Sequence, residues 1–321
     1  MINGLLIGLL IFAFIYGIGV GARQWFPYHL LKKAKNAFIE AHQNETQYGV
    51  AYDKNIIFES LRDDTEYYVL LLAGQSNMGG LGDINSLDKN DQQLPENIKF
   101  FNFSLDYNLN YKIQTFGPEV SLSQQLHSYF PNKHFVIIKY AVDGSSLLDW
   151  SPNWTYKKAQ ITGKAHLGPL YNIFIERIIQ ITGGKKINFL AMLWMQGETD
   201  AQIPKASKQY YKNLSIIISN LRTDLNEPNL PVFLGHVNPP LSGFPAVGIV
   251  RKAQEKISQN VRNVYLISTN NLQKWKNDDL HYNTQGQLEL GKRFFLSLIK
   301  TITAQQNEAL DGDSPPLHPR Q

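Results

Sequence analysis

Apolar runs of strand length alternate with amphipathic stretches of helix length through the middle of the chain. A short apolar run is typical of a strand buried on both faces, and apolar residues three or four positions apart are typical of a helix that covers a sheet. The predicted strands are Tyr67–Leu72, His134–Tyr140, Ile187–Met195, Val232–Val237 and Val264–Ile267. The predicted helices are Glu119–Tyr129, Pro169–Ile181, Ser207–Leu221, Val247–Asn260 and Gln285–Ile302. The alternation predicts a three-layer α/β/α, doubly wound (flavodoxin-like) domain with a mainly parallel five-stranded sheet.

The N-terminus has a different pattern, because no charged side chain occurs from Ile2 to Ala22. About 20 apolar residues are enough to cross a bilayer as a helix. The alternative is a cleaved signal peptide, but no basic residue follows Met1 and the run is longer than the usual apolar core of such peptides. We therefore predict an N-terminal transmembrane helix over residues 1–22, and the protein would be a single-pass, membrane-anchored one.

The segments on either side of the folded domain show weaker patterns. Residues 23–60 contain an amphipathic stretch with interleaved Lys, which predicts a juxtamembrane segment. Residues 304–321 are rich in Gln, Asp, Pro and Ser without apolar periodicity, so we expect a disordered tail. Residues 61–303 remain as one folded domain, and the oligomeric state cannot be read from the pattern.

Composition limits the classes of function. Of the 321 residues, 43% are hydrophobic and 18% are charged, which is typical of a globular protein. A net charge of +4 is too small to favour nucleic acid as a partner. The absence of Cys excludes disulfides and thiolate chemistry.

The first motif with chemistry is Gly74-Gln75-Ser76-Asn77-Met78, directly after a predicted strand. A serine on a tight turn past a strand end is exposed to a ligand, and backbone amides of that turn can point toward a bound carbonyl. The turn equally fits a serine that only caps a helix. The second glycine of G-x-S-x-G is missing, which disfavours the α/β-hydrolase type of turn.

The second motif is Asn277-Asp278-Asp279-Leu280-His281, between the last strand and the last helix. A serine nucleophile needs an imidazole to take its proton, and the imidazole needs a carboxylate to fix its tautomer. A His in a polar loop is often only solvated, but both this loop and Ser76 follow the carboxyl ends of predicted strands, where ligands bind in such sheets. Asp278 and Asp279 are both candidates for the carboxylate.

Two further polar motifs follow predicted strands. In Trp194-Met195-Gln196-Gly197-Glu198-Thr199-Asp200, the side-chain amide of Gln196 could donate to an oxyanion, or the segment could be a turn capped by Thr199 or Asp200. In Ala141-Val142-Asp143-Gly144-Ser145-Ser146, the backbone amide of Gly144 could be another donor. Four such motifs at strand ends are together less easily explained by chance than any one of them.

These four blocks, in this order, resemble the sialate O-acetylesterase and acetylxylan esterase branch of the SGNH hydrolases. The resemblance covers about Tyr67 to Thr303 and implies the SGNH-hydrolase fold. It implies that Ser76 is the nucleophile, His281 the general base and Asp278 its partner. It also implies an oxyanion hole made by the Ser76 and Gly144 amides and the Gln196 side chain, with Gln75, Asn77 and Glu198 as neighbouring block residues. We expect Glu198 to hold Gln196 and the loop by hydrogen bonds, although it could instead touch substrate. Met195 stands where the family commonly has His.

The resemblance implies a serine esterase that removes O-acetyl groups from a carbohydrate, either a sialic acid or a polysaccharide. An O-acetyltransferase of envelope polysaccharide and a non-catalytic glycan-binding module on an esterase fold are the alternatives. Such substrates favour an extracytoplasmic catalytic domain, but Arg23, Lys32, Lys33 and Lys35 after the apolar run favour the opposite orientation.

No cofactor is predicted. The eight His residues are scattered without H-E-x-x-H, and the glycine-rich Gly79–Asp83 lacks the Lys-Ser/Thr of a phosphate loop. Trp150, Trp154 and Trp194 lie near strand ends, where they could either stack on a sugar ring or pack in the core.

Overall fold

The computed structural model describes residues 61–89, 91–104 and 115–312, with side chains as far as Ala304. Its centre is a parallel sheet, six-stranded within these residues, in the order β3-β5-β1-β6-β7-β8. A short antiparallel pair, β2-β4, lies apart from it. The strands are β1 (Glu66–Gly74), β2 (Gly82–Asp83), β3 (Ile98–Asn102), β4 (Thr115–Phe116), β5 (His134–Ala141), β6 (Lys186–Met195), β7 (Val232–Gly235) and β8 (Val264–Ile267).

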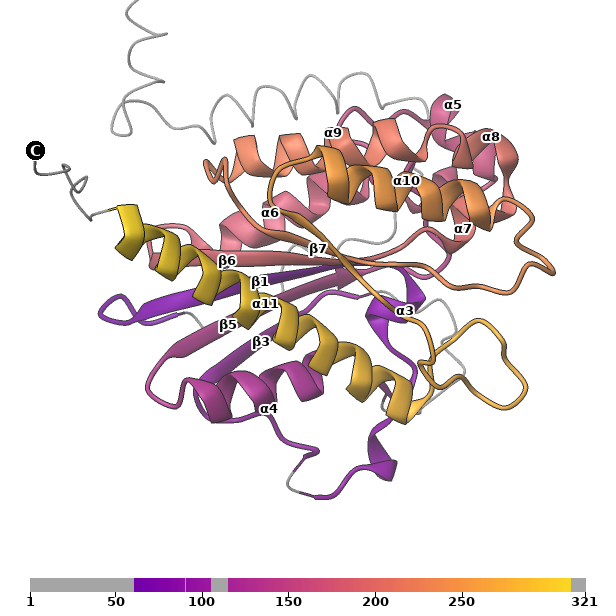
Figure 1. Ribbon diagram of the computed structural model, residues 1–321. Coiled ribbons are helices and arrows are strands. Elements are labelled where there is room, and N and C mark those ends of the chain that lie inside the picture. The colour runs from indigo at the N-terminus through magenta and orange to yellow at the C-terminus, as the bar shows by residue number, and fades with distance from the viewer. Residues whose placement is uncertain (1–60, 90, 105–114, 313–321) are drawn as a thin grey trace, which may run out of the picture. The chain divides into compact units, whose positions relative to one another are not determined.

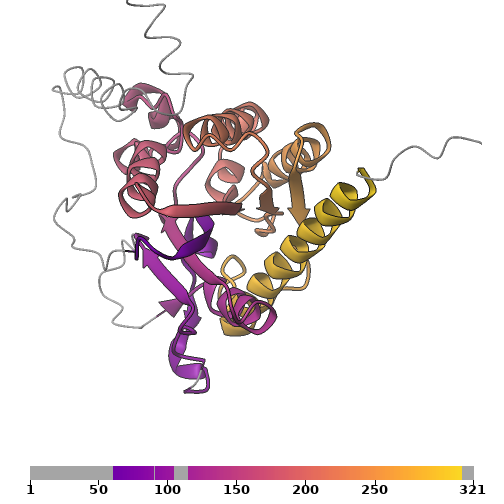
Figure 2. The same ribbon diagram turned by 90° about the vertical axis from the view of Figure 1, so that its left-hand side faces the viewer.

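Helices cover both faces of the sheet (Figures 1 and 2). They are α3 (Ser76–Gly79), α4 (Glu119–Tyr129), α5 (Tyr156–Ala159), α6 (Leu170–Thr182), α7 (Glu198–Gln202), α8 (Pro204–Ser207), α9 (Tyr210–Asp224), α10 (Val247–Asn260) and α11 (Thr284–Gly312). Short 3-10 turns occupy Ile84–Ser86, Gln160–Thr162 and Ala165–Leu167. Helices α4 and α11 pack together on one face, and α6, α9 and α10 lie on the other. The predicted three-layer α/β/α arrangement is therefore present.

The strand sequences explain why the sheet lies in the core. Val69 to Ala73 of β1 are all fully buried, because helices cover both faces of this central strand. Without β3, the five predicted strands stand in the order 2-1-3-4-5 of the flavodoxin-like fold. In that order the chain reverses direction across the sheet between β1 and β6, and ligands bind at such a switch point.

The prediction of a five-stranded sheet is wrong by one edge strand. β3 pairs with β5 in parallel at the edge of the sheet, from Ile98↔Phe135 to Asn102↔Lys139. Its short sequence, Ile98-Lys99-Phe100-Phe101-Asn102, combines apolar residues with two polar ones and lacks the long apolar run of a central strand. This segment forms a strand because it pairs with β5, not because its own sequence has a strand pattern.

The last helix is longer than its apolar pattern predicts. α11 continues to Gly312, whereas the pattern ends at Ile302 and residues from 304 onward were expected to be a disordered tail. Ala, Gln, Glu and Leu between residues 304 and 310 are good helix formers, and no Gly or Pro interrupts them before Gly312. Helix propensity therefore extends the element beyond its predicted end at Ile302.

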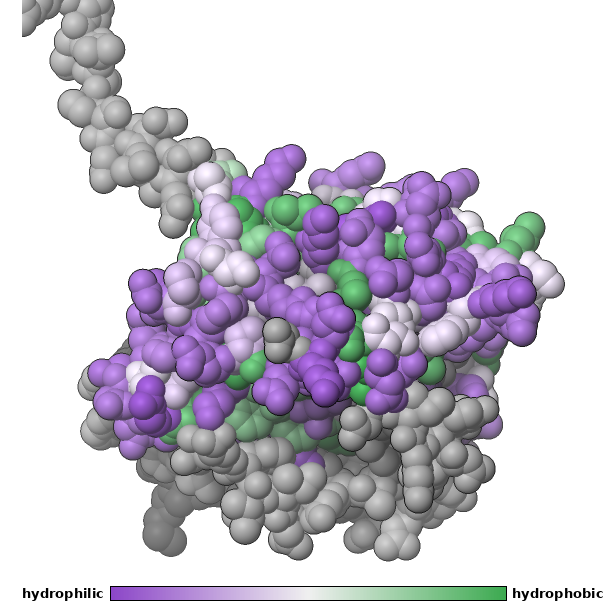
Figure 3. Space-filling model, turned by 90° about the horizontal axis from the view of Figure 1, so that it is seen from below, coloured by the Kyte–Doolittle hydropathy of each residue, from purple (hydrophilic) through white to green (hydrophobic). Residues whose placement is uncertain are grey.

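The predicted transmembrane helix at residues 1–22 and the juxtamembrane segment at 23–60 lie outside the described residues. Within the described part, no helix is both long and apolar enough to cross a membrane. In the view of Figure 3, hydrophilic side chains cover most of the described surface and apolar ones are interspersed among them.

Candidate active site

Three of the four sequence motifs meet at the switch point of the sheet. They follow the carboxyl ends of β5, β1 and β6, which are adjacent strands. The fourth, the loop with Asp278 and His281, lies between β8 and α11 and reaches the same edge. The topology thus brings residues 205 positions apart in sequence into hydrogen-bond distance.

Ser76 stands on a turn that only glycine permits. β1 ends at Gly74, whose φ is +154°, and a Cβ atom there would lie 2.0 Å from the Met195 carbonyl oxygen of β6. The Gln75 amide donates to that same oxygen at 2.9 Å. The close approach of β1 to β6 therefore ends the strand and turns the chain into α3, which begins at Ser76.

Ser76, His281 and Asp278 form a continuous hydrogen-bonded chain. Ser76 Oγ lies 2.9 Å from His281 Nε2, and His281 Nδ1 lies 2.6 Å from Asp278 Oδ2. A carboxylate can only accept, so Nδ1 carries the proton and Nε2 is left to accept from the serine hydroxyl. Of the two candidate carboxylates, Asp278 is the one that contacts His281; the Asp279 carbonyl oxygen accepts from Lys274 Nζ.

The surroundings of Asp278 favour its charged form. Burial raises the pKa of this carboxyl, but hydrogen bonds from the His281 ring and from the Leu280 and His281 amides outweigh it and hold the pKa below its usual value. The two amides donate to Oδ1 at 2.9 and 3.0 Å. Asp278 is thus prepared to stabilise an imidazolium on His281.

Asn77 connects the serine turn to the histidine loop. Its Oδ1 accepts from the Tyr282 amide at 3.1 Å, and its Nδ2 donates to the Leu280 carbonyl at 3.3 Å and to Glu198 Oε1 at 2.8 Å. Asn77 is 1% exposed, so these bonds are shielded from water. One buried amide therefore fixes both neighbours of His281 relative to Ser76.

The backbone amides of Ser76 and Gly144 are free to donate, since neither has a protein acceptor among the described residues. Gly144 lies in a tight turn closed by the Ser145 amide and the Val142 carbonyl, and its φ is +67°. The Lys164 ammonium group lies 3.8 Å from the point that a Cβ of Gly144 would occupy. These amides fit the expected oxyanion donors, with a cation beside them.

The side chain of Gln196 does not fit the expected oxyanion contact. Gln196 is fully buried, and its Nε2 donates to the Ser145 carbonyl at 3.0 Å and to Asp200 Oδ2 at 2.6 Å. Both N–H groups are therefore already used by protein acceptors. The structure corrects the expected role: Gln196 holds the loop that follows Gly144 instead of pointing to the place of an oxyanion.

Glu198 and Gln75 belong to the same buried network. Glu198 is 1% exposed and bonds Asn77, so it lies away from substrate, and its contact is with Asn77 rather than with Gln196. Oriented by its neighbours, the Gln75 amide donates to Glu198 Oε2 and to the Ser145 carbonyl, each at 3.2 Å. Burial raises the pKa of Glu198, and the Asn77 bond opposes that shift only in part.

Two buried carboxyls behind the site, Asp149 and Asp200, were missed as functional candidates. The sequence leaves open a turn capped by Thr199 or Asp200, but the N-terminus of α7 has no side-chain cap bond. Asp200 instead accepts from the Leu147 amide at 3.0 Å. The available signal was Asp149 within the apolar run Leu147-Leu148-Asp149-Trp150, because an isolated acid in such a run must be paired or functional.

The tryptophans near the strand ends are mostly core residues. Trp150 and Trp194 are fully buried and pack edge to face, 5.2 Å between ring centroids. Trp154 is half-buried and lies against Gly168. The exposed aromatic ring beside the histidine loop is Trp275, 41% exposed, whose Nε1 donates to the Leu81 carbonyl.

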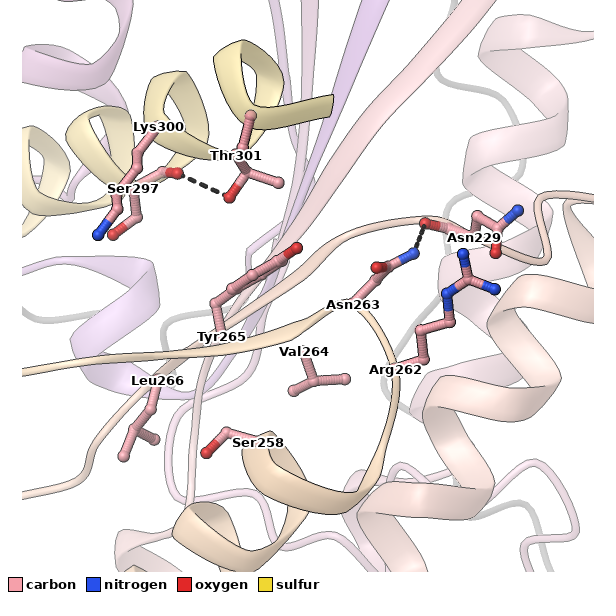
Figure 4. A pocket seen from close by; sticks show the side chains of 11 residues that line it. Asn229, Ser258, Arg262, Asn263, Val264, Tyr265, Leu266, Ser297, Lys300 and Thr301 are labelled. Atoms are coloured by element: carbon pink, nitrogen blue, oxygen red, sulfur yellow. Dashed lines mark hydrogen bonds between the residues drawn. The ribbon is translucent and has the colours of Figure 1, made fainter. Parts of the chain in front are cut away.

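A cavity of about 860 Å³ lies beside the edge strand β8, between α10 and α11. Figure 4 shows Asn263 bonded to the Asn229 carbonyl and Thr301 to the Ser297 carbonyl at its wall. None of the predicted site residues lines this cavity. Within the described ranges, no group of three or more His, Asp or Glu side chains is arranged to hold a metal ion.

Comparison with known proteins identifies the class. A family model described as "Carbohydrate esterase, sialic acid-specific acetylesterase" matches residues 66–300. A probable carbohydrate esterase of Arabidopsis thaliana is 27% identical over 248 residues, which are 70% of this chain and 86% of the relative.

Solved structures share the fold. An Arabidopsis thaliana protein has a TM-score of 0.59 at 22% identity, covering 73% of this chain and 98% of its own. NanS has a TM-score of 0.56 at 15% identity, covering 76% and 100%. A carbohydrate acetylesterase from Xanthomonas citri has a TM-score of 0.55 at 17% identity, covering 71% and 55%.

The protein is therefore a carboxylic-ester hydrolase with an SGNH-type fold. The chain belongs to the carbohydrate esterase family of sialic acid-specific acetylesterases, which confirms the resemblance seen in its motifs.

Proposed function

We propose that this protein is a serine esterase that removes O-acetyl groups from a carbohydrate through an acetyl-enzyme on Ser76. The observation that carries the proposal is the chain Ser76 Oγ, His281 Nε2, His281 Nδ1 and Asp278 Oδ2, with links of 2.9 and 2.6 Å. Both distances lie within hydrogen-bond reach, which is what a serine nucleophile needs to pass its proton to a base. The family supplies the ester and carbohydrate class.

In the first half-reaction, Ser76 Oγ attacks the acetyl carbonyl carbon as His281 Nε2 takes the hydroxyl proton. The ionised Asp278 stabilises the imidazolium, and the free amides of Ser76 and Gly144 donate to the oxyanion. The C–O bond to the sugar then breaks, and His281 returns its proton to the sugar oxygen. In the second half, His281 takes a proton from water, the hydroxide attacks the acetyl-enzyme, and acetate leaves with Ser76 reprotonated.

Access agrees with these roles. Ser76 is 6% exposed, whereas the side chains of His281 and Asp278 are 24% and 39% exposed. An ester can therefore approach from the solvent side of the histidine loop, where Trp275 offers an exposed ring to a sugar. A glycan-binding module would have no use for the proton-transfer chain.

The substrate class can be narrowed by charge. The segment 151–169 carries Lys157, Lys158, Lys164 and His166 but no Asp or Glu, and Lys164 lies beside Gly144. A cation at this place would attract an anionic group near the acetyl ester. Of the two expected substrate types, this favours an acetylated sugar acid over a neutral polysaccharide.

Ser76→Ala in the full-length protein tests the proposal. Loss of the nucleophile leaves only binding and oxyanion contributions, so acetate release from an aryl acetate should fall at least about a thousandfold. Circular dichroism should show an unchanged fold. Retention of more than about a tenth of the activity would exclude Ser76 as the nucleophile.

The same assay separates hydrolysis from acetyl transfer. With an added sugar acceptor, an esterase still releases free acetate in proportion to ester consumed. Appearance of acetylated acceptor at the expense of acetate would instead identify an O-acetyltransferase.

A further inference from the structure

The loop that follows Gly144 is held by two buried carboxyls. The Ser146 amide donates to Asp149 Oδ2 at 2.8 Å, and the Leu147 amide donates to Asp200 Oδ2 at 3.0 Å. Asp149 belongs to the same loop, whereas Asp200 belongs to α7, the helix that follows β6 in the sequence. Two successive amides of the loop are thus bound by acids from two different parts of the chain.

Gln196 extends this arrangement to the preceding residue. Its Nε2 joins the Ser145 carbonyl to Asp200 Oδ2, so that Asp200 accepts from Gln196 and Leu147 with the same oxygen. The Ser145 hydroxyl in turn accepts from Trp150 Nε1 at 3.1 Å. Ser145 directly follows Gly144, so these bonds hold the backbone and the side chain of the residue beside the free Gly144 amide.

Such an arrangement is costly to fold. Asp149 and Asp200 are both fully buried, each keeps one oxygen without a partner, and neither has an ion pair among the described residues. Burial raises the pKa of each carboxyl to about 7. Buried acids without counter-ions destabilise a protein, and their presence at an active site indicates a role in its chemistry.

Charged or titratable groups face this pair from several elements. The charge of Glu198 on α7 raises the pKa of Asp200, and the charge of Asp200 raises that of Tyr210 on α9. Lys164, just before the 3-10 turn Ala165–Leu167, opposes the rise in the pKa of Asp149. The Lys164 ammonium is also the cation beside Gly144. The electrostatics of the pair and of the oxyanion position are therefore linked through space.

We propose that Asp200 and Asp149 are positioning residues, named here the loop clamp, which fix the Ser145–Leu147 backbone and thereby hold the Gly144 amide in place for the oxyanion. The inference rests on the proposed function, because it assigns a purpose to the oxyanion donor of that reaction. Gly144 has no side chain to anchor it, and an oxyanion donor is effective only if it is preorganised to within a fraction of an ångström. The clamp touches no substrate and acts only through the loop.

Asp200→Ala in the full-length protein removes the shared acceptor of Leu147 and Gln196. If the Gly144 amide then drifts, kcat should fall about a hundredfold, as for loss of one oxyanion donor, while KM changes less than about threefold. A phosphonate ester that forms a tetrahedral adduct with Ser76 should react more slowly by a similar factor. A role in stability alone would instead lower Tm and leave kcat per folded molecule unchanged.

Asp200→Asn is the matched variant. Its carbonyl oxygen can replace Oδ2 and accept both bonds, so kcat should recover to within about tenfold of wild type. If the alanine variant does not fold, Asp149→Ala serves instead, with a smaller fall of about tenfold because one bond is lost. Asp224→Asn is the control. The Asp224 carboxyl accepts from the Tyr171 hydroxyl at 2.7 Å. Asp224 lies about 20 Å along α9 from Tyr210, so kcat should not change in this variant.

A folded Asp200→Ala enzyme with kcat within about threefold of wild type would overturn the loop clamp, as would equal losses in the Ala and Asn variants. Ser76→Ala is measured in parallel. If it is inactive while Asp200→Ala is not, only the clamp fails; if it is active, the proposed function itself fails.

Discussion

At the scale of single residues, the site depends on buried side chains with several bonds each. Asn77 uses its amide oxygen and nitrogen to hold Tyr282, Leu280 and Glu198. Replacing it with Ala would leave the buried Tyr282 amide and Glu198 carboxyl with fewer partners, and such groups cost about 1–3 kcal/mol each. Its position beside the nucleophile therefore makes it a structural part of the reaction geometry.

Lys164 provides the prediction on specificity. In Lys164→Met, KM for an acetylated sugar acid should rise about tenfold, because about 1.4 kcal/mol of charge-assisted contact is lost. KM for a neutral acetylated sugar should stay near wild type, and any change in kcat should be the same on both substrates, because Lys164 lies beside Gly144 whichever sugar is bound. Initial rates of acetate release on the two substrates measure the effect.

Lys157→Met is the control, since Lys157 is an exposed lysine of the same segment that has no contact with Gly144. An equal change in KM on both substrates in Lys164→Met would show that Lys164 shapes the loop instead of binding an anion. If KM for the acetylated sugar acid does not change in Lys164→Met, the proposed attraction between Lys164 and an anionic group of the substrate is wrong.

The sequence predicts some site residues better than others. Ser76, His281 and Asp278 could be placed because each chemical type occurs at a strand end in the required order, and the structure brings them together. The role of Gln196 could not be predicted, because a glutamine that holds a buried loop and a glutamine that donates to an oxyanion look the same in the sequence motif. Only the positions of Ser145 and Asp200 in space distinguish the two.

At the scale of elements, local pattern decides most of the fold. The strand Val264–Ile267 and the helices Glu119–Tyr129 and Val247–Asn260 have the predicted bounds, because apolar periodicity and burial coincide there. β3 was missed because its partner β5, rather than its own sequence, makes it a strand. α11 exceeds its apolar stripe because helix formers continue to Gly312.

The loop after β5 and α7 should have a characteristic pH dependence. The folded pKa of Asp149 and of Asp200 is raised to about 7, above the usual value of about 3.9, so the folded protein binds more protons than the unfolded chain between these values. The stabilising contribution of the protonated forms is thus complete below pH ~4 and is lost as pH rises through about 7. The side chain introduced by Asp200→Asn is neutral at every pH. This variant therefore does not lose the part of the stability that depends on protonation of Asp200.

Thermal unfolding from about pH 5 to about pH 8 measures this difference. The Tm of Asp200→Asn minus that of wild type should increase with pH across the range. A difference that stays constant would show that Asp200 ionises in the folded protein as it does in the unfolded chain.

At the scale of the whole molecule, the esterase domain is one part of a longer chain. The family match ends at residue 300 and begins at residue 66, so the apolar stretch from Ile2 to Ala22 lies outside the matched region. An uncharged stretch of this length is enough to anchor the protein in a membrane. We propose that it does so, with the catalytic domain on the extracytoplasmic side, where acetylated glycans occur.

The anchor proposal predicts the behaviour of the full-length chain on fractionation. The protein should sediment with membranes through washes with salt or alkali and become soluble only in detergent, because about 20 apolar residues bind the hydrocarbon core too strongly for such washes to release them. Deleting residues 2–22 should release an active enzyme into the soluble fraction. Protease added to intact cells or right-side-out vesicles should digest the catalytic domain if it is extracytoplasmic. Protection of the domain from the protease would show that it lies on the cytoplasmic side. A mature N-terminus near Arg23 would instead identify the segment as a cleaved signal peptide.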